Sequence, residues 1–67
     1  MNLSKVLRLA RKLRYNIRLE VSPNGYGAYV GHQDRPKLDP WETGSPPLPN
    51  LEELADWLGA WLLEHAV

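Results

Sequence analysis

The chain has no cysteine and no phenylalanine among its 67 residues, and its histidines are His32 and His65. Without cysteine, disulfide bonds and thiolate metal sites are excluded. Two imidazoles need carboxylates to complete a zinc site, and the remaining candidates for metal or acid–base chemistry are Asp34, Asp39 and Glu42. The sequence also lacks a glycine-rich phosphate loop, a nucleophile elbow and a paired-histidine motif. We therefore expect no enzyme, no bound cofactor or metal, and no small-molecule substrate.

Long hydrophobic runs are also missing. The apolar stretch near the N-terminus is interrupted by a cation every third or fourth residue, so neither a membrane span nor a secretory signal is expected. The absence of cysteine and of a targeting segment fits a cytoplasmic location. A chain of this length makes one domain, 1–67, and buries only about 60% of its unfolded surface. So small a core favours self-association, and we expect a homodimer or other homo-oligomer.

Charges of opposite sign are separated along the chain, although the formal net charge is zero. No acid precedes Glu20, and six of the eight basic residues lie before residue 19: Lys5, Arg8, Arg11, Lys12, Arg14 and Arg18. Six of the eight acids lie toward the C-terminus: Asp39, Glu42, Glu52, Glu53, Asp56 and Glu64. Because the distribution of charge decides which surface meets which partner, the two ends of the chain should present surfaces of opposite sign.

The N-terminal segment has the period of a helix. Apolar residues recur at three- and four-residue spacing, namely Leu3, Val6, Leu7, Ala10 and Leu13. The cations Lys5, Arg8 and Lys12 fall on the opposite side. Asn2 or Ser4 can cap the start, so we predict a helix over residues 3–14 with a basic outer face.

The period then changes to that of strands. Apolar and polar residues alternate over 15–22, and 26–33 forms a second strand after Pro23-Asn24-Gly25. A two-residue Asn24-Gly25 turn would pair Val21 with Ala28 and Leu19 with Val30, which places apolar side chains on one face. A three-residue turn would exchange the faces, so burial selects the first register. In that register Gly27, Tyr29 and Gly31 face away from the helices.

Residues 34–49 contain five of the six prolines, so this segment is predicted to be an ordered loop, at best with a short edge strand near residues 38–41. Its Trp41 favours order, because a tryptophan gains from burial. A second helix follows over residues 51–65, capped by Asn50. Its core stripe comprises Leu51, Leu54, Ala55, Leu58 and Leu62, whereas Trp57 and Trp61 share one side and Leu63 falls on the polar side.

This order predicts an α+β domain with both helices on one face of an antiparallel sheet of two or three strands. The stretch from Ile17 to Val30, followed by Leu48-Pro49-Asn50-Leu51-Glu52-Glu53-Leu54, resembles antitoxins of the HicB type. The resemblance implies a hairpin that leads into a capped helix. The chain departs from that pattern in its basic first helix, its proline-rich loop and the lack of a predicted third strand.

Two functional hypotheses follow. The first is a small, non-enzymatic regulatory protein that binds a protein partner or itself, like the accessory, inhibitor and antitoxin proteins of bacteria and phages. Its contact residues would be Trp57, Trp61 and Leu63, with Trp41 and Tyr29 next, because aromatic and exposed apolar side chains dominate interfaces. The alternative is a nucleic-acid-binding regulator that uses Lys5, Arg8, Arg11 and Lys12 on phosphates. Both sets also have structural explanations, as the edge of the core and as a solvated helix face.

Overall fold

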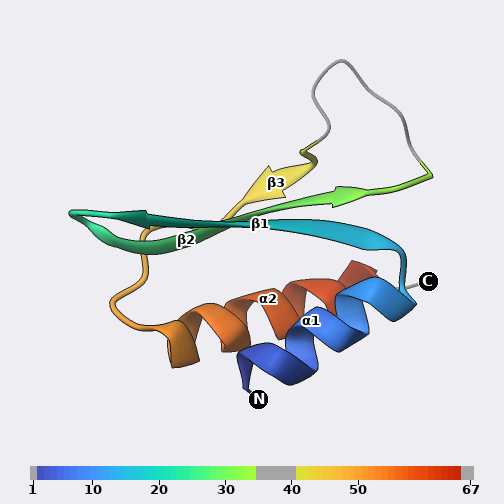
Figure 1. The fold of residues 1–67 in the computed structure, drawn as a ribbon, viewed down its shortest axis with the longest axis horizontal. Coiled ribbons are helices and arrows are strands. Elements are labelled where there is room, and N and C mark those ends of the chain that lie inside the picture. Colours follow the sequence, from blue (N-terminus) through green and yellow to red (C-terminus); the bar gives the residue numbers. More distant parts are fainter. Residues whose placement is uncertain (1, 35–40, 66–67) are drawn as a thin grey trace.

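Two helices cover one face of a three-stranded antiparallel sheet in a computed structural model that describes residues 2–34 and 41–65 (Figure 1). The elements are α1 (Leu3–Lys12), β1 (Tyr15–Ser22), β2 (Gly25–His32), β3 (Thr43–Gly44) and α2 (Leu51–His65), and the strand order is β1-β2-β3. The predicted α+β architecture is confirmed, and of the two or three strands predicted the sheet has three. We call the sheet face toward the helices the helix-side face and the opposite one the outer face.

Both helices begin at an asparagine cap. The Asn2 carboxamide oxygen accepts the backbone N–H of Lys5 at 2.9 Å, and that of Asn50 accepts the N–H of Glu53 at 2.8 Å. These bonds satisfy backbone donors that have no partner inside the helix. At its other end α1 stops two residues before the predicted boundary, because Arg14 adopts a left-handed conformation (φ 66°) that turns the chain into β1.

The hairpin register differs from the prediction. The turn residues are Pro23 and Asn24, not Asn24 and Gly25, and the pairing Ser22–Gly25 brings Val21 opposite Tyr26. The predicted pairs Val21–Ala28 and Leu19–Val30 are wrong by two residues: Leu19 lies opposite Ala28, and Ile17 lies opposite Val30. Proline explains the shift, since its fixed φ suits the second turn position and it has no N–H to donate at a strand end. Gly25 then takes the positive φ of 129°.

A shift of two residues leaves the faces unchanged, because strand side chains alternate with a period of two. Ala28 and Val30 are therefore buried on the helix-side face, and Tyr29 lies on the outer face, as predicted. Together with residues of both helices they form one core: Val6, Ala10, Tyr15, Ala28, Val30, Leu54, Ala55, Leu58 and Leu62.

The buried side of α1 is rotated relative to the prediction. Leu7 was expected in the core, yet it is 38% exposed, whereas Leu9 packs against the core cluster. The reason is that α1 packs against α2 as well as against β1, so its buried sector turns toward the other helix. In α2, the predicted core residue Leu51 is also exposed, because it lies in the first turn, at the end of the packed region.

The described part of the proline-rich segment, residues 41–49, lies against β2. Thr43 and Gly44 pair with Val30 and Tyr29, which adds the short strand β3. Further along, Leu48 and Tyr26 exchange two backbone hydrogen bonds of 2.8 Å. Of the edge strand predicted near 38–41, residues 38–40 lie outside the described residues, and the observed strand begins two residues after Trp41. Among the residues described, neither helix is long and apolar enough to cross a membrane.

Candidate functional site

Large apolar side chains are exposed where β1 passes over the helices. Leu19 is 44% exposed and Val21 is 76% exposed, although both belong to the helix-side face. Leu7 of α1 and Leu51 of α2 are exposed as well. Leu19 and Val21 are neighbours on one face of β1, and we call this pair the hairpin patch. Adjacent exposed apolar side chains are typical of interaction surfaces.

The patch exists because the helices are shorter than the hairpin. The ten residues of α1 span about 15 Å at 1.5 Å per residue, whereas the eight residues of β1 span about 26 Å. Figure 1 shows that the hairpin tip extends past the first turns of both helices. Val21 lies near this tip, so nothing in the described chain can bury it fully.

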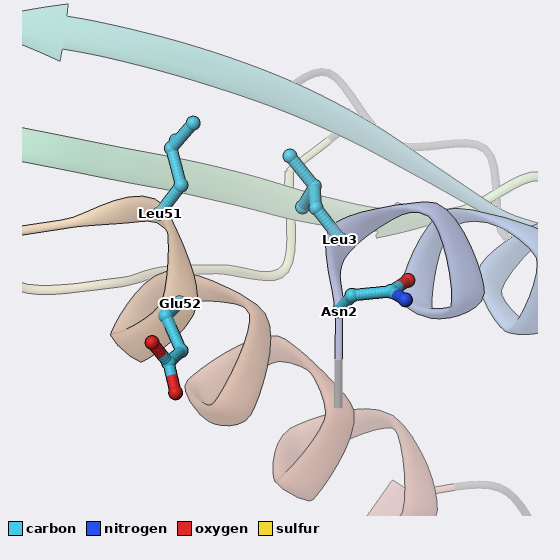
Figure 2. A pocket seen from close by; sticks show the side chains of 4 residues that line it. All are labelled: Asn2, Leu3, Leu51 and Glu52. Atoms are coloured by element: carbon cyan, nitrogen blue, oxygen red, sulfur yellow. The ribbon is translucent and has the colours of Figure 1, made fainter.

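An open hollow separates the two helix N-termini beneath the sheet. It has a volume of about 440 Å³ and is lined by Asn2 and Leu3 of α1 and by Leu51 and Glu52 of α2. Figure 2 shows both leucine side chains pointing from their helices toward the sheet, while Glu52 points away from it. The part of the hollow nearest the sheet is therefore lined by apolar side chains.

The tryptophans of α2 do not form one surface with Leu63. Trp57 and Trp61 are half-buried and pack against the core, and the Trp61 ring meets Tyr15 edge-on with ring centroids 5.4 Å apart. The Trp61 ring also stacks on His65, with ring centroids 4.1 Å apart. Leu63 is 60% exposed and, two residues along the helix, points to the side opposite Trp61. Leu63 is thus an exposed apolar side chain that lies apart from the two tryptophans.

Tyr29 and Trp41 lie together over the sheet, with ring centroids 6.3 Å apart. Gly44, opposite Tyr29 in the ladder, has no side chain, and a Cβ built there would lie 3.0 Å from the tyrosine ring. The space over Gly27 is occupied by Ser45, whose Oγ would lie 3.6 Å from an added Cβ. The glycine-rich outer face thus accommodates the chain's own loop.

The four cations named for nucleic acid are all exposed on α1: Lys5, Arg8, Arg11 and Lys12. No residue of α1 is acidic, so these cations form one basic surface. The acids Glu52, Glu53 and Asp56 are exposed on α2. The separation of charge along the sequence is therefore a separation between the two helices.

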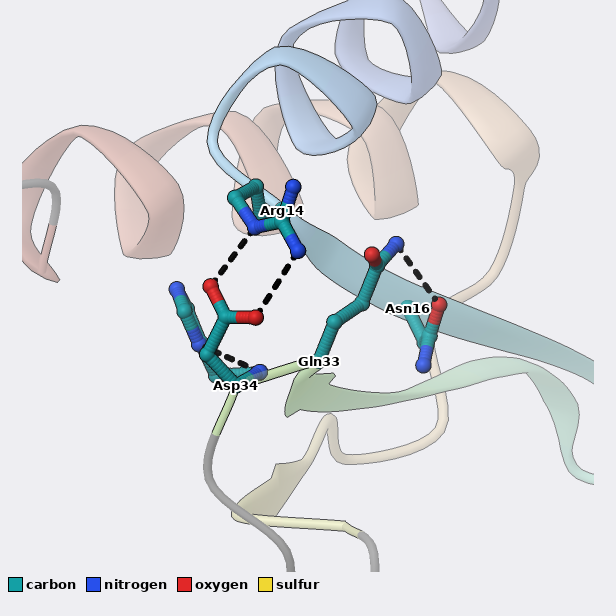
Figure 3. Close-up of polar contacts among 5 residues, drawn as sticks. Arg14, Asn16, Gln33 and Asp34 are labelled. Atoms are coloured by element: carbon teal, nitrogen blue, oxygen red, sulfur yellow. Dashed lines mark hydrogen bonds and ion pairs between the residues drawn. The ribbon is translucent and has the colours of Figure 1, made fainter.

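The candidates for acid–base or metal chemistry are engaged in structural contacts. Arg14 binds Asp34 through two hydrogen bonds, Nε to Oδ2 at 2.6 Å and Nη2 to Oδ1 at 2.8 Å (Figure 3). The Nδ1 atom of His32 accepts the Asp34 backbone N–H at 3.1 Å, and a Glu42 carboxylate oxygen accepts the N–H of His32 at 2.9 Å. Asp39 lies outside the described residues. Within the residues described, no three potential metal ligands lie close enough to hold an ion together.

The ion pair between Arg14 and Asp34 predicts a pH dependence. Hydrogen bonds from Arg14 lower the pKa of Asp34 below its ordinary value. A lowered pKa in the folded state means that the pair stabilises the fold above the unfolded pKa, and that this contribution is lost as pH falls through the folded pKa. In an NMR titration, Asp34 should titrate at lower pH in the wild type than in Arg14→Gln. Lys12→Gln, which removes an exposed cation two residues before Arg14, should leave the midpoint unchanged. An unchanged midpoint in Arg14→Gln would contradict the assignment.

Comparisons with protein-family models, with curated proteins and with solved structures gave no significant match. Sequence reasoning missed the hairpin patch, because alternation showed which face Leu19 and Val21 occupy but not how far the helices reach beneath them. The lengths of the predicted helix and strand contained that information.

Proposed function

We propose that the protein is a small, non-enzymatic regulatory protein of the accessory, inhibitor or antitoxin kind, and that it acts in the bacterial cytoplasm by binding another protein chain. The observation that carries the proposal is the hairpin patch. Val21, with three quarters of its surface exposed, lies beside Leu19 on the same strand face. A partner that covers these side chains would gain about 25 cal/mol for each Å² of apolar surface removed from water.

The remaining candidate contacts flank this surface or stand apart from it. The Tyr29–Trp41 pair lies on the outer face, and Leu63 lies on the solvent side of α2. Trp57 and Trp61 already pack against the core, which leaves them less surface to offer. The hairpin patch is thus the primary contact surface in this proposal.

An activity of the protein's own is less well supported, because the polar groups that chemistry would use are already engaged. The Asp34 carboxylate accepts two hydrogen bonds from Arg14, and the Glu42 carboxylate accepts the backbone N–H of His32 at the end of β2. A catalytic side chain has to reach a substrate, and these side chains instead fasten the open end of the hairpin.

Photo-crosslinking in the native host tests the proposal. A benzoylphenylalanine residue at position 21 in place of Val21 should form adducts with a protein, whether another protein or a second copy of this chain. The same probe at Glu53, exposed on α2, is the matched control and should give few adducts. Absence of any protein adduct from position 21 would refute docking through the hairpin patch.

The second candidate is binding of nucleic acid, favoured by the uninterrupted basic surface of α1. The same experiment addresses it, with the probe placed at Arg8. Adducts with nucleic acid that form from this position when a lysate is irradiated at low salt, and that are absent when the same lysate is brought to high salt before irradiation, would support phosphate binding. Protein adducts confined to position 21 would instead favour the first proposal.

A further inference from the structure

Within the described residues, β1 has one strand neighbour, β2, and its other edge is a regular strand edge. It is eight residues long and contains no proline or glycine, two of the residues by which edge strands are commonly disrupted. Its side chains on the outer face include one cation and one anion, Arg18 and Glu20. A charge of each sign can repel a wrong partner and attract a complementary one.

The hydrogen-bond pattern shows which backbone groups point outward from this edge. Toward β3, the Tyr26 N–H donates to Leu48, and the carbonyls of Ala28 and Val30 accept from Ser45 and Glu42, at 2.8, 2.8 and 2.7 Å. The backbone groups of successive strand residues point to opposite neighbouring strands. The odd-numbered residues of β2 therefore form hydrogen bonds with β1, and their partners in β1 are the even-numbered residues. The N–H and C=O groups of Ile17, Leu19 and Val21 therefore project from the edge.

We infer that a second copy of this chain pairs antiparallel with β1, about a two-fold axis at Leu19, to make a continuous six-stranded sheet. In this register Leu19 lies opposite its own copy, and Ile17 lies opposite Val21. Each of these residues donates and accepts one backbone hydrogen bond, so that every outward group of Ile17, Leu19 and Val21 is satisfied.

Charge favours this register over the alternative registers of the same strand pair. With the axis at Leu19, Arg18 of each copy lies opposite Glu20 of the other, so two attractive pairs form on the outer face. The next registers that join the same backbone groups place the axis at Arg18 or at Glu20. They would set two arginines or two glutamates directly opposite each other, which destabilises a strand pair. A parallel, in-register pair would oppose like charges as well.

Shape supports the same arrangement. A second hollow, of about 260 Å³, lies at this edge between α1 and β1, and its lining includes Leu7, Ala10 and Ile17. In the proposed register, Val21 of one copy lies opposite Ile17 of the other, beside this hollow. The most exposed of the large apolar side chains described in one copy thus meets the space left open in the second. The short helix of each copy would cover the strand end that the other copy leaves bare.

This inference rests on the proposed function, since it names a second copy as the chain that the hairpin patch contacts. The decisive experiment is sedimentation of the full chain over a range of concentrations, with four variants. Arg18→Glu alone and Glu20→Arg alone each oppose like charges and should weaken dimerisation about tenfold or more. The swap Arg18→Glu with Glu20→Arg restores complementarity and should return the dissociation constant to within about threefold of wild type. Leu63→Glu should have no effect.

Hydrogen exchange supplies an independent readout. The N–H groups of Ile17, Leu19 and Val21 should exchange more slowly at dimer-forming concentration, and the slowing should be lost in Arg18→Glu. The N–H of Arg18, which bonds within each copy, is the internal control. A chain that stays monomeric at millimolar concentration, a dimer indifferent to both single charge changes, or one that Leu63→Glu dissociates would overturn the inference. A monomer that still forms adducts from position 21 with another protein would leave the proposed function standing.

Discussion

Replacing Leu58 with alanine should lower the free energy of unfolding by about 2–5 kcal/mol. Leu58 is completely buried in the middle of α2, within the cluster that joins both helices to the sheet. The substitution removes three buried carbon atoms and leaves a cavity, because the neighbours relax only in part. A domain of this size has a total stability of roughly 3–10 kcal/mol, so the loss would be a large part of it.

Leu63→Ala is the matched control, since it makes the same chemical change five residues later on the exposed side of the same helix. Its effect should remain within about 0.5 kcal/mol. Urea unfolding followed by circular dichroism, at one protein concentration for all variants, measures both changes. The fixed concentration matters because association would stabilise the folded state by mass action. Equal effects of the two substitutions would mean that α2 packs through a different side.

The second large effect is expected at Gly25. Gly25→Ala should destabilise the fold by about 2 kcal/mol or more, for two reasons that add. The residue has a φ of 129°, which side chains rarely adopt, and a Cβ placed there would lie 2.4 Å from the carbonyl oxygen of Leu48. That oxygen is bonded to the Tyr26 N–H, so the two-bond bridge between Tyr26 and Leu48 would have to shift.

Gly27→Ala provides the comparison within the same strand. Its Cβ would make an ordinary contact at 3.6 Å with Ser45, and its φ is not positive, so we expect a change within about 0.5 kcal/mol. Thermal or urea unfolding gives the two values. In Gly25→Ala the N–H groups of Tyr26 and Leu48 should also exchange faster with solvent. If Gly27→Ala proved as costly as Gly25→Ala, the turn assignment would be wrong.

The helices, their caps and the faces of both strands could be predicted, because each depends on local periodicity and on a few specific residues. Asn50 illustrates this, since a short polar side chain before an apolar period has one favourable use. The strand register could not be predicted from the Asn-Gly signal alone. Pro23 competes for the same turn, and the proline with its fixed φ prevails over the preference of Asn24-Gly25.

The hairpin patch was missed for a different reason. Leu19 and Val21 have the spacing of buried residues, and burial depends on what lies beneath them in three dimensions. Leu7 was mispredicted for the same reason. Its position in the helical pattern fits a core stripe, but the packing of α1 against α2 rotates the buried side of α1 away from it. The proposed contact surface thus arises from a mismatch between the lengths of the helices and the hairpin, which no single residue reveals.

Nearly half of the core, including all of its fully buried leucines, comes from α2: Leu54, Ala55, Leu58 and Leu62. During synthesis the basic helix and the hairpin must therefore leave the ribosome with their apolar sides still uncovered. Until residue 62 has emerged, the core residues of this nascent segment lack their packing partners from α2. The step that completes the core is the arrival of α2, so chaperones and proteases should find residues 3–44 accessible until residue 62 has left the ribosome.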